Sequence, residues 1–143
     1  MKKTVQVVAA VIENERREIL CALRSGQMSL SNMWEFPGGK VKEGENLFTA
    51  LEREVYEEMS CRIQAQEVFH ENVHEYDTFI IQLIVIKAEL VQGVPQTNEH
   101  AKLIWLQREN LPSLHWAPAD MPAVEALMNE PLKEQTGSFK RQK

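Results

Sequence analysis

The chain of 143 residues is long enough to fold as one domain around its own hydrophobic core. Hydrophobic residues make up 43% and charged residues 26%, as in an ordinary globular protein, and no apolar stretch is long enough to cross a bilayer. The formal net charge of −5 argues against a nucleic-acid polymer as partner, because such binding depends on basic side chains. Cys21 and Cys61 form no disulfide or metal-ligand pattern, so we expect a reducing, cytoplasmic location and no membrane partner.

The first third of the chain predicts a pair of strands followed by a loop and a third, brief strand. Residues 4–12 are rich in Val and Ile and lead into Glu13-Asn14-Glu15, which favours a strand over a signal peptide. Pro37 and the glycine pair after it interrupt regular structure. In order, the expected elements are a strand at 4–12, a turn at 13–17, a strand at 18–23, a loop at 25–33, a brief strand at 34–36 and a loop at 37–44.

A helix is predicted at residues 46–59, where apolar side chains recur with helical spacing. These apolar residues are Phe48, Leu51, Val55 and Met59. The elements expected after it are strands at 61–75, 77–89 and 103–106, a turn at 92–95 and a closing helix at 119–128. The strand at 77–89 is nearly continuous in apolar residues, which predicts burial on both faces. We expect one mixed α/β domain at residues 1–133 and a flexible, polar tail at 134–143.

Three glutamates of the predicted helix lie on one of its faces. Glu54, Glu57 and Glu58 stand at positions i, i+3 and i+4, where like charges cost about 0.2–0.5 kcal/mol per pair. A divalent cation removes this repulsion, and oxygen ligands without His or Cys suit Mg²⁺ or Mn²⁺ rather than Zn²⁺. The preceding glycines let backbone groups approach metals and phosphates, because no Cβ intervenes. Taken alone, such a face is more often solvated surface than a metal site.

The wider spacing resembles the signature of the Nudix hydrolases. Gly39, Glu45 and the run Arg53-Glu54-Val55-Tyr56-Glu57-Glu58 match the Nudix box at fixed offsets, and residues 34–42 (WEFPGGKVK) resemble its MutT-like branch. The likeness extends over roughly residues 3–128. One position departs from the pattern, because Ser60 stands where the family has a glycine that serves the left-handed helix end. The resemblance implies an α/β/α sandwich with a mixed sheet.

The resemblance also implies a reaction and a set of site residues. Water attacks the β-phosphorus of a nucleoside triphosphate, which gives the monophosphate and pyrophosphate, with Mg²⁺ as cofactor. The implied metal ligands are the Gly38 carbonyl, Glu54, Glu57, Glu58 and Glu99. The implied catalytic residues are Glu54, Glu99 and Arg53, the last of which supports the loop–helix junction together with Glu45. Either Glu54 or Glu99 is the general base. The implied substrate contacts are Arg24, Gly39, Lys40 and Asp120.

The base preference depends on Asp120, at the start of the closing helix. Branch members that act on 8-oxo-dGTP carry an asparagine there, which donates and accepts hydrogen bonds, whereas an ionised carboxylate only accepts. An acceptor suits an exocyclic amine such as N4 of cytosine, and residues 117–122 resemble the CTP and 5-methyl-dCTP pyrophosphohydrolases of the branch. Oxidised guanine also presents donors, so both substrates remain open. Asp120 also has the simpler interpretation of a helix cap.

Two other functions compete with this hypothesis. One is a nucleotide sensor that binds without cleaving, against which the intact set of glutamates argues. The other is a Nudix hydrolase for another nucleoside diphosphate derivative such as ADP-ribose, or for capped RNA; the short chain leaves no room for a further substrate domain, and the acidic balance disfavours RNA. We expect a small-molecule nucleotide as substrate, in nucleotide-pool sanitising or housekeeping, and a monomer or homodimer. No catalytic role is expected for the four histidines, although His100 adjoins Glu99.

Overall fold

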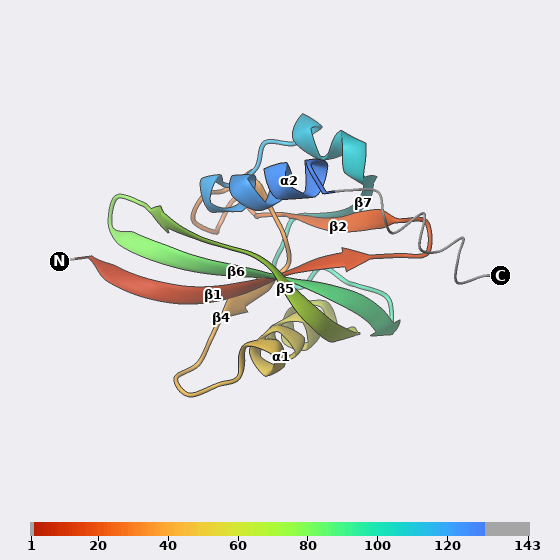
Figure 1. Ribbon diagram of the computed structural model, residues 1–143, viewed down its shortest axis with the longest axis horizontal. Coiled ribbons are helices and arrows are strands. Elements are labelled where there is room, and N and C mark those ends of the chain that lie inside the picture. The colour runs from red at the N-terminus through yellow and green to blue at the C-terminus, as the bar shows by residue number, and fades with distance from the viewer. Residues whose placement is uncertain (1, 131–143) are drawn as a thin grey trace.

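In the computed structural model, which describes residues 2–130, a mixed sheet separates helix α1 (Leu47–Met59) from helix α2 (Met121–Met128) (Figure 1). The strands are β1 (Lys3–Glu13), β2 (Glu18–Leu23), β3 (Trp34–Glu35), β4 (Gly38–Lys40), β5 (Arg62–Glu75), β6 (Phe79–Gln92) and β7 (Lys102–Gln107). Two 3₁₀ helices, η1 (Arg108–Ser113) and η2 (Pro118–Asp120), lie on the α2 side (Figure 1). The expected tail and the domain end at 133 lie outside the described residues. None of the described helices is long and apolar enough to span a bilayer.

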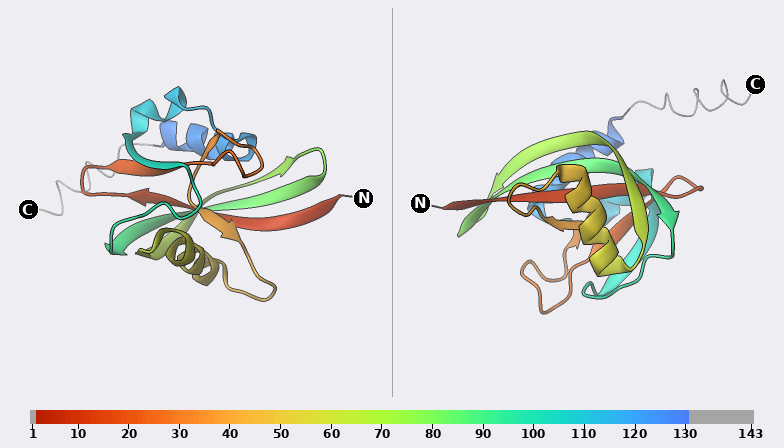
Figure 2. Two further views of the ribbon diagram at one scale, coloured as in Figure 1. Left: turned by 180° about the vertical axis from the view of Figure 1, so that it is seen from behind. Right: turned by 90° about the horizontal axis from the view of Figure 1, so that it is seen from below.

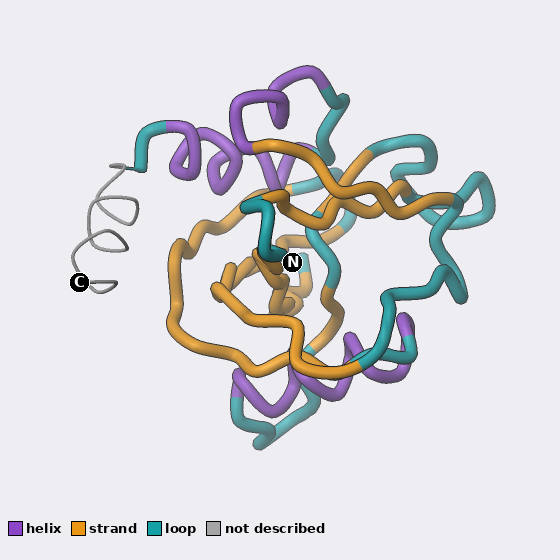
Figure 3. Tube along the Cα trace, turned by 90° about the vertical axis from the view of Figure 1, so that its right-hand side faces the viewer, coloured by secondary structure: helices purple, strands orange, loops and turns teal. Residues whose placement is uncertain are grey.

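The sheet is organised around β1 and β6, which run parallel with Val8 opposite Ile84. The strand order is β3-β2-β1-β6-β5, while β4 pairs with β1 and β7 pairs with β2. β5 and β6 form a long antiparallel hairpin with register shifts near residues 65–70. Viewed end-on, the helices lie on opposite sides of the curved strands (Figure 3), and from below α1 crosses the face of the sheet (Figure 2). This is the α/β/α sandwich expected from the resemblance.

The two faces of the sheet bury two separate sets of apolar side chains. Because side chains alternate along a strand, Val8 and Ile12 of β1 pack toward α1, whereas Ala9 and Val11 pack toward α2. The apolar stripe of α1 is buried as its spacing predicts, with Leu51 and Val55 at most 1% exposed. Each helix is thus held to the sheet by its own core.

Both ends of α1 are fixed by local backbone interactions. The Asn46 side chain accepts hydrogen bonds from the backbone N–H groups of Phe48 and Thr49, which satisfies donors left free at a helix start. At the other end Ser60 adopts the left-handed conformation, with φ 57° and ψ 32°, and donates its N–H to the Tyr56 carbonyl. Ser60 therefore takes the geometry that a glycine normally supplies, and the departure from the family pattern leaves the helix end intact.

Four features differ from the sequence-based expectation. Residues 38–40 form strand β4 instead of a loop, because the bare backbone of Gly38 approaches β1 so closely that a Cβ would lie 1.9 Å from the Val8 carbonyl oxygen. The closing helix begins at Met121 after the 3₁₀ turn η2, and η1 was not expected. The strand expected at 77–89 is β6, and its predicted burial on both faces holds for residues 83–86. At residues 79–82 the side chains are only half-buried.

Candidate active site

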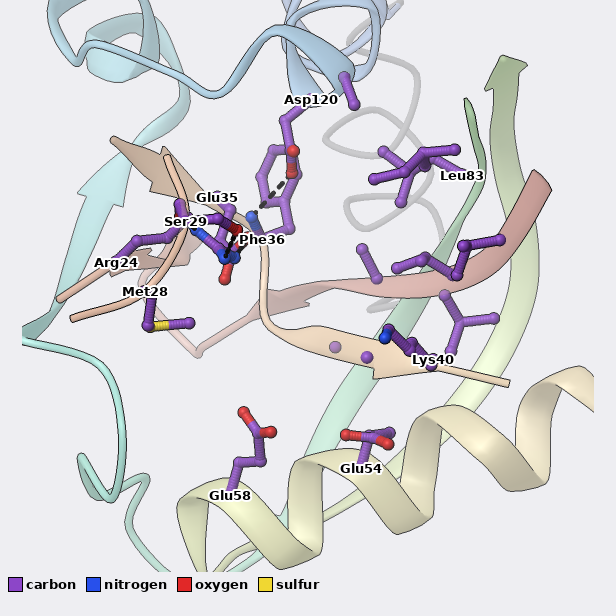
Figure 4. Close-up of a pocket in the computed structure, with 18 of the residues that line it drawn as sticks. Arg24, Met28, Ser29, Glu35, Phe36, Lys40, Glu54, Glu58, Leu83 and Asp120 are labelled. Carbon is purple, nitrogen blue, oxygen red and sulfur yellow. Dashed lines mark hydrogen bonds and ion pairs between the residues drawn. The ribbon is translucent and has the colours of Figure 1, made fainter. Parts of the chain in front are cut away.

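A cavity of about 560 Å³ lies between α1 and η2 and is lined by residues of β1, β4 and β6. Glu54 and Glu58 of α1 form its acidic end and Asp120 of η2 stands at the opposite end (Figure 4). The wall between them is largely apolar and comes from β1 and β6. Its side chains include Val5, Val7, Phe79, Ile81 and Leu83. The half-buried part of β6 is therefore the part that lines the cavity.

The acidic end depends on a close approach between β4 and α1. Glu54 and Glu58 project from α1 toward β4 (Figure 4). A Cβ added to Gly39 would lie 2.1 Å from Oε1 of Glu54, so only glycine leaves room for this carboxylate beside the strand. Lys40, which follows on β4, lines the same cavity. The glycine pair thus permits two close approaches, that of Gly38 to β1 and that of Gly39 to Glu54 of α1.

Behind this end, Arg53 joins the loop after β4 to α1. Its guanidinium donates to both carboxylate oxygens of Glu45, at 2.7 and 2.9 Å, and to the Lys40 carbonyl at 3.2 Å. It also donates to Glu54 and Glu57, each at 3.1 Å. The hydrogen bond from Arg53 lowers the pKa of Glu45 to about 2. Arg53 and Glu45 thus connect the loop after β4 to α1, and their role in supporting the site stays a prediction.

At the opposite end, Asp120 is buried and accepts a hydrogen bond from the Phe36 backbone N–H at 3.0 Å (Figure 4). Burial, together with the charge of Glu35, raises the pKa of Asp120 to about 8, although the Phe36 bond and Arg24 act in the opposite direction. The carboxyl group is therefore largely protonated at neutral pH. A protonated carboxyl donates as well as accepts hydrogen bonds, so the raised pKa lets Asp120 offer a donor beside the acceptor considered from the sequence.

Arg24 enters the cavity as part of a charged chain (Figure 4). Its Nη1 donates to Oε1 of Glu35 at 2.8 Å, and its Nε donates to the Ser29 carbonyl at 2.6 Å. The other oxygen of Glu35 lies 2.7 Å from Nε2 of His100, whose side chain is 3% exposed. Glu35 thus connects the loop after β2 to the segment that carries Glu99.

Comparison with known proteins identifies the family. The NUDIX domain pattern matches residues 8–126. The CTP pyrophosphohydrolase of Escherichia coli K12 is 36% identical over 126 residues, which are 88% of this chain and 93% of the relative. The 8-oxo-dGTP diphosphatase of Haemophilus influenzae is 32% identical over 90% of this chain and 95% of the relative. The chain belongs to the Nudix family. A solution structure of MutT, a Nudix hydrolase from methicillin-resistant Staphylococcus aureus 252, matches with TM-score 0.74 and 45% identity over 92% of this chain and 100% of that one.

This Nudix hydrolase is MutT-like, and its acidic end fits the divalent metal that the family typically uses. Among residues 2–130, the carboxylate of Glu58 takes part in no hydrogen bond or ion pair. Burial, and the neighbouring charges of Glu99 and Glu54, raise the pKa of Glu58 to about 7. A cation would offset this accumulation of negative charge, and a set of oxygen donors suits Mg²⁺ or Mn²⁺.

Two of the predicted ligands, Glu57 and Glu99, do not line the cavity of the Nudix site. Glu57 pairs with Arg53 and its side chain is 53% exposed, and Glu99 is exposed on the segment before β7. Within residues 2–130, no three acidic, histidine or cysteine side chains are grouped closely enough to hold an ion by themselves. An ion at this end would therefore need backbone or substrate oxygens as well, as Mg²⁺ commonly does. The ligand set of Gly38, Glu54, Glu57, Glu58 and Glu99 stays a prediction.

Most of the predicted site residues are brought together by the Nudix fold. Those that line the cavity are Arg24, Gly38, Gly39, Lys40, Glu54, Glu58 and Asp120. Those that do not are Arg53, Glu57 and Glu99. Arg53 contacts Glu54 from behind, so its geometry is that of a positioning residue. Sequence reasoning missed Glu35, Phe36 and Met28 as cavity residues; only the segment WEFPGGKVK, which contains the first two, gave a signal.

Proposed function

We propose that the protein hydrolyses a nucleoside triphosphate to the nucleoside monophosphate and pyrophosphate with Mg²⁺, which Mn²⁺ can replace. The observation that carries this proposal is that a single cavity has an acidic, glycine-lined end and an apolar lobe. The apolar lobe is the part walled by β1 and β6, and it ends at the buried carboxyl of Asp120. Its volume of about 560 Å³ lies in the range of sites for small ligands. A nucleotide has a matching arrangement, with a charged phosphate chain at one end and an aromatic base at the other.

Different residues along the cavity contact the base and the triphosphate. The base lies in the apolar lobe, where Phe79 and Leu83 cover its surface and Asp120 meets its polar edge. The triphosphate extends toward the acidic end, where Lys40 supplies positive charge, while Arg24, paired with Glu35, lines the cavity between the two ends. Mg²⁺, when bound, neutralises charge on the phosphate oxygens and makes water a better nucleophile. Cleavage adds water across the bond between the α- and β-phosphates, so the proton of that water must be taken up by a base.

Glu54 is the better placed of the two candidate bases. Its carboxylate lines the cavity and accepts a hydrogen bond from the Arg53 guanidinium at 3.1 Å, whereas Glu99 is exposed on its segment. We therefore expect Glu54→Gln to lower kcat more than Glu99→Gln does, because a general base must lie within reach of the attacking water. An equal or larger loss in Glu99→Gln assigns the base to Glu99 instead. Single-turnover rates measured at saturating nucleotide separate this chemical step from product release.

The preferred base is either cytosine or oxidised guanine. The curated relatives act, by their names, on CTP in one case and 8-oxo-dGTP in others. A neutral Asp120 carboxyl combines a donor and an acceptor, which resembles the asparagine amide of the 8-oxo-dGTP branch more than an ionised carboxylate does. The carboxyl thus suits the adjacent donor and acceptor atoms on the edge of either base. Asp120→Asn tests this directly, because it keeps both hydrogen-bonding functions and removes titration.

A substrate panel decides between the enzyme and the alternatives. The purified protein with Mg²⁺ is incubated with CTP, 5-methyl-dCTP, dGTP, 8-oxo-dGTP and ADP-ribose, and pyrophosphate and monophosphate are measured. Release of pyrophosphate from a triphosphate supports the proposal, and the ratio of kcat/KM values names the base. Tight binding of a triphosphate without turnover identifies a sensor, and turnover of ADP-ribose alone identifies a hydrolase of that class. The cytoplasm, where triphosphates are consumed, is the location that this proposal requires.

A further inference from the structure

The segment that carries Asp120 is held by two side chains from the β5–β6 hairpin. The Ala119 backbone N–H donates to the hydroxyl oxygen of Tyr76 at 3.1 Å, and the Asn72 side-chain amide donates to the Ala119 carbonyl at 3.3 Å. Both polar backbone groups of one residue are therefore taken by side chains more than 40 positions away. Ala119 lines the cavity directly beside Asp120.

Such external support matters because η2 has little hydrogen bonding of its own. It is a single 3₁₀ turn of three residues, Pro118–Asp120, with backbone bonds from the Asp120 N–H to the Ala117 carbonyl and from the Met121 N–H to the Pro118 carbonyl. The N–H groups at the start of a helix have no partner within the helix and must find one elsewhere. Tyr76 provides that partner for Ala119. The hairpin thus helps to set the position of the turn, together with the bonds from the Ala117 N–H to the Trp34 carbonyl and from the Phe36 N–H to Asp120.

The surroundings of Asn72 indicate that its side chain serves this contact. Its Oδ1 is buried and, among the described residues, has no hydrogen-bond partner. A buried, unpaired acceptor is unfavourable, and an apolar side chain would avoid it. What the asparagine gains is the bond from its amide to Ala119, which an apolar side chain cannot make. Tyr76 has a second link to the site, because its ring stacks on Phe79 of the cavity wall with centroids 5.2 Å apart.

We propose that Tyr76 and Asn72 are positioning residues that clamp the Ala119 backbone and thereby set the depth at which Asp120 meets the base. The clamp determines base selectivity without touching the base, and it leaves phosphate chemistry at the acidic end unchanged. This inference rests on the proposed function for its kinetic readout. It extends the specificity determinants to two residues on the hairpin, at a distance from the Nudix box in sequence.

Tyr76→Phe tests the clamp while keeping the aromatic ring and its stacking. We expect the Ala119 amide to exchange faster with solvent, and the ratio of kcat/KM between CTP and 8-oxo-dGTP to change about 2- to 10-fold, as for loss of one hydrogen bond, mainly through KM. Asn72→Leu, which removes the other half of the clamp, should move the ratio in the same direction. Tyr56→Phe is the matched control, because Tyr56 is exposed on α1, the other tyrosine of the chain, and lies outside the cavity.

Combination with Asp120→Ala separates a positioning role from a merely structural one, because alanine removes the carboxyl group that the clamp positions. If the clamp acts through Asp120, the effect of Tyr76→Phe on the base ratio is largely lost in the Asp120→Ala variant, whereas independent effects simply add. Unchanged Ala119 exchange, or faster exchange with an unchanged base ratio, overturns the proposal. An equal fall in kcat for every base does so as well.

Failure of the proposed hydrolase function can be distinguished from failure of the clamp. If the wild-type protein releases no pyrophosphate from any triphosphate, the hydrolase proposal fails, and the ratio of dissociation constants for CMP and 8-oxo-dGMP replaces the kinetic ratio. A change of that ratio in Tyr76→Phe but not in Tyr56→Phe supports the clamp alone. Binding of neither monophosphate by the wild-type protein overturns the clamp together with the function.

Discussion

The guanidinium of Arg53 holds the carboxylate of Glu45 with two hydrogen bonds, from Nε to Oε2 at 2.7 Å and from Nη2 to Oε1 at 2.9 Å. Glu45 in turn accepts the backbone N–H of Lys42, so the loop after β4 is bound to α1 through this pair. The same guanidinium reaches Glu54 and Glu57 on the helix. One side chain therefore fixes the loop and orients two glutamates at once.

We expect Arg53→Lys to lower kcat by about 10- to 100-fold, because small displacements of reacting groups have effects of that size. A lysine carries a compact charge and cannot make the paired contact with Glu45 while also reaching the helix glutamates. Steady-state kinetics and circular dichroism together check this result. Arg16→Lys, on the exposed β1–β2 turn, is the control that should match the wild type. Full activity of Arg53→Lys would show that a single positive charge suffices at this position.

The two glutamates at the end of α1 should differ in their effect on metal dependence. Glu58 lines the cavity without a hydrogen bond or ion pair among the described residues, whereas Glu57 is 53% exposed and bound to Arg53. We expect Glu58→Gln to lower kcat about 100-fold or more and to raise the Mg²⁺ concentration for half-maximal activity, since bound metal contributes several kcal/mol to the transition state. Removal of the metal with EDTA should abolish turnover in the wild type, and addition of Mg²⁺ should restore it.

Glu57→Gln serves as the comparison within the same helix turn. Its loss in kcat should be smaller than that of Glu58→Gln if Glu57 only supports Arg53, and equally large if it ligates the metal. Isothermal titration of each folded variant with Mn²⁺ gives the affinity independently of turnover. An unchanged Mn²⁺ affinity in Glu58→Gln would falsify its assignment as a ligand.

The sequence predicts the box helix and much of the site because these signals are local. The apolar stripe of α1 and the glutamate spacing both lie within one short segment, so helical periodicity is enough to place them. Strand β4 escaped prediction because it has three residues, two of them glycines with no preference for strands, and exists only through its approach to Val8.

The remaining contacts depend on segments that are far apart in the sequence. Glu35 and His100 are 65 positions apart, and Tyr76 and Ala119 are 43 apart. No local sequence pattern predicts such pairs, since each residue alone has an ordinary interpretation as a strand or loop residue. The raised pKa of Asp120 has the same origin, because it results from burial that only the folded chain creates. Expectations based on the ordinary charge of a residue fail at such positions.

The raised pKa of Asp120 has a consequence for stability. The folded protein keeps the proton until about pH 8, whereas the unfolded chain releases it near the ordinary value of 3.8. Between these values the unfolded state binds fewer protons, so this group lowers the free energy of unfolding as pH rises, by at most about 1.4 kcal/mol per pH unit. Asp120→Asn removes this dependence, and its stability relative to the wild type should increase from pH 5 to pH 8.

Urea unfolding at several pH values measures this difference. Asp77→Asn is the matched control, because Asp77 is the only other aspartate of the chain and is exposed in the β5–β6 turn. Its stability relative to the wild type should stay nearly constant over the same range. A constant difference for Asp120→Asn as well would mean that Asp120 is ionised in the folded protein, and the acceptor-only interpretation of the base contact would return.

Ser60 offers a stability gain at the end of α1. Its left-handed backbone, φ 57° and ψ 32°, costs a residue with a Cβ about 1–2 kcal/mol, while glycine loses about 0.5–1 kcal/mol more backbone entropy on folding. The balance predicts that Ser60→Gly raises the free energy of unfolding by about 0.5–1 kcal/mol. Ser60→Ala keeps the Cβ and should show no gain. Because Ser60 lies outside the cavity, kcat should not change in either variant, and a Ser60→Gly protein no more stable than Ser60→Ala would show that the serine is unstrained.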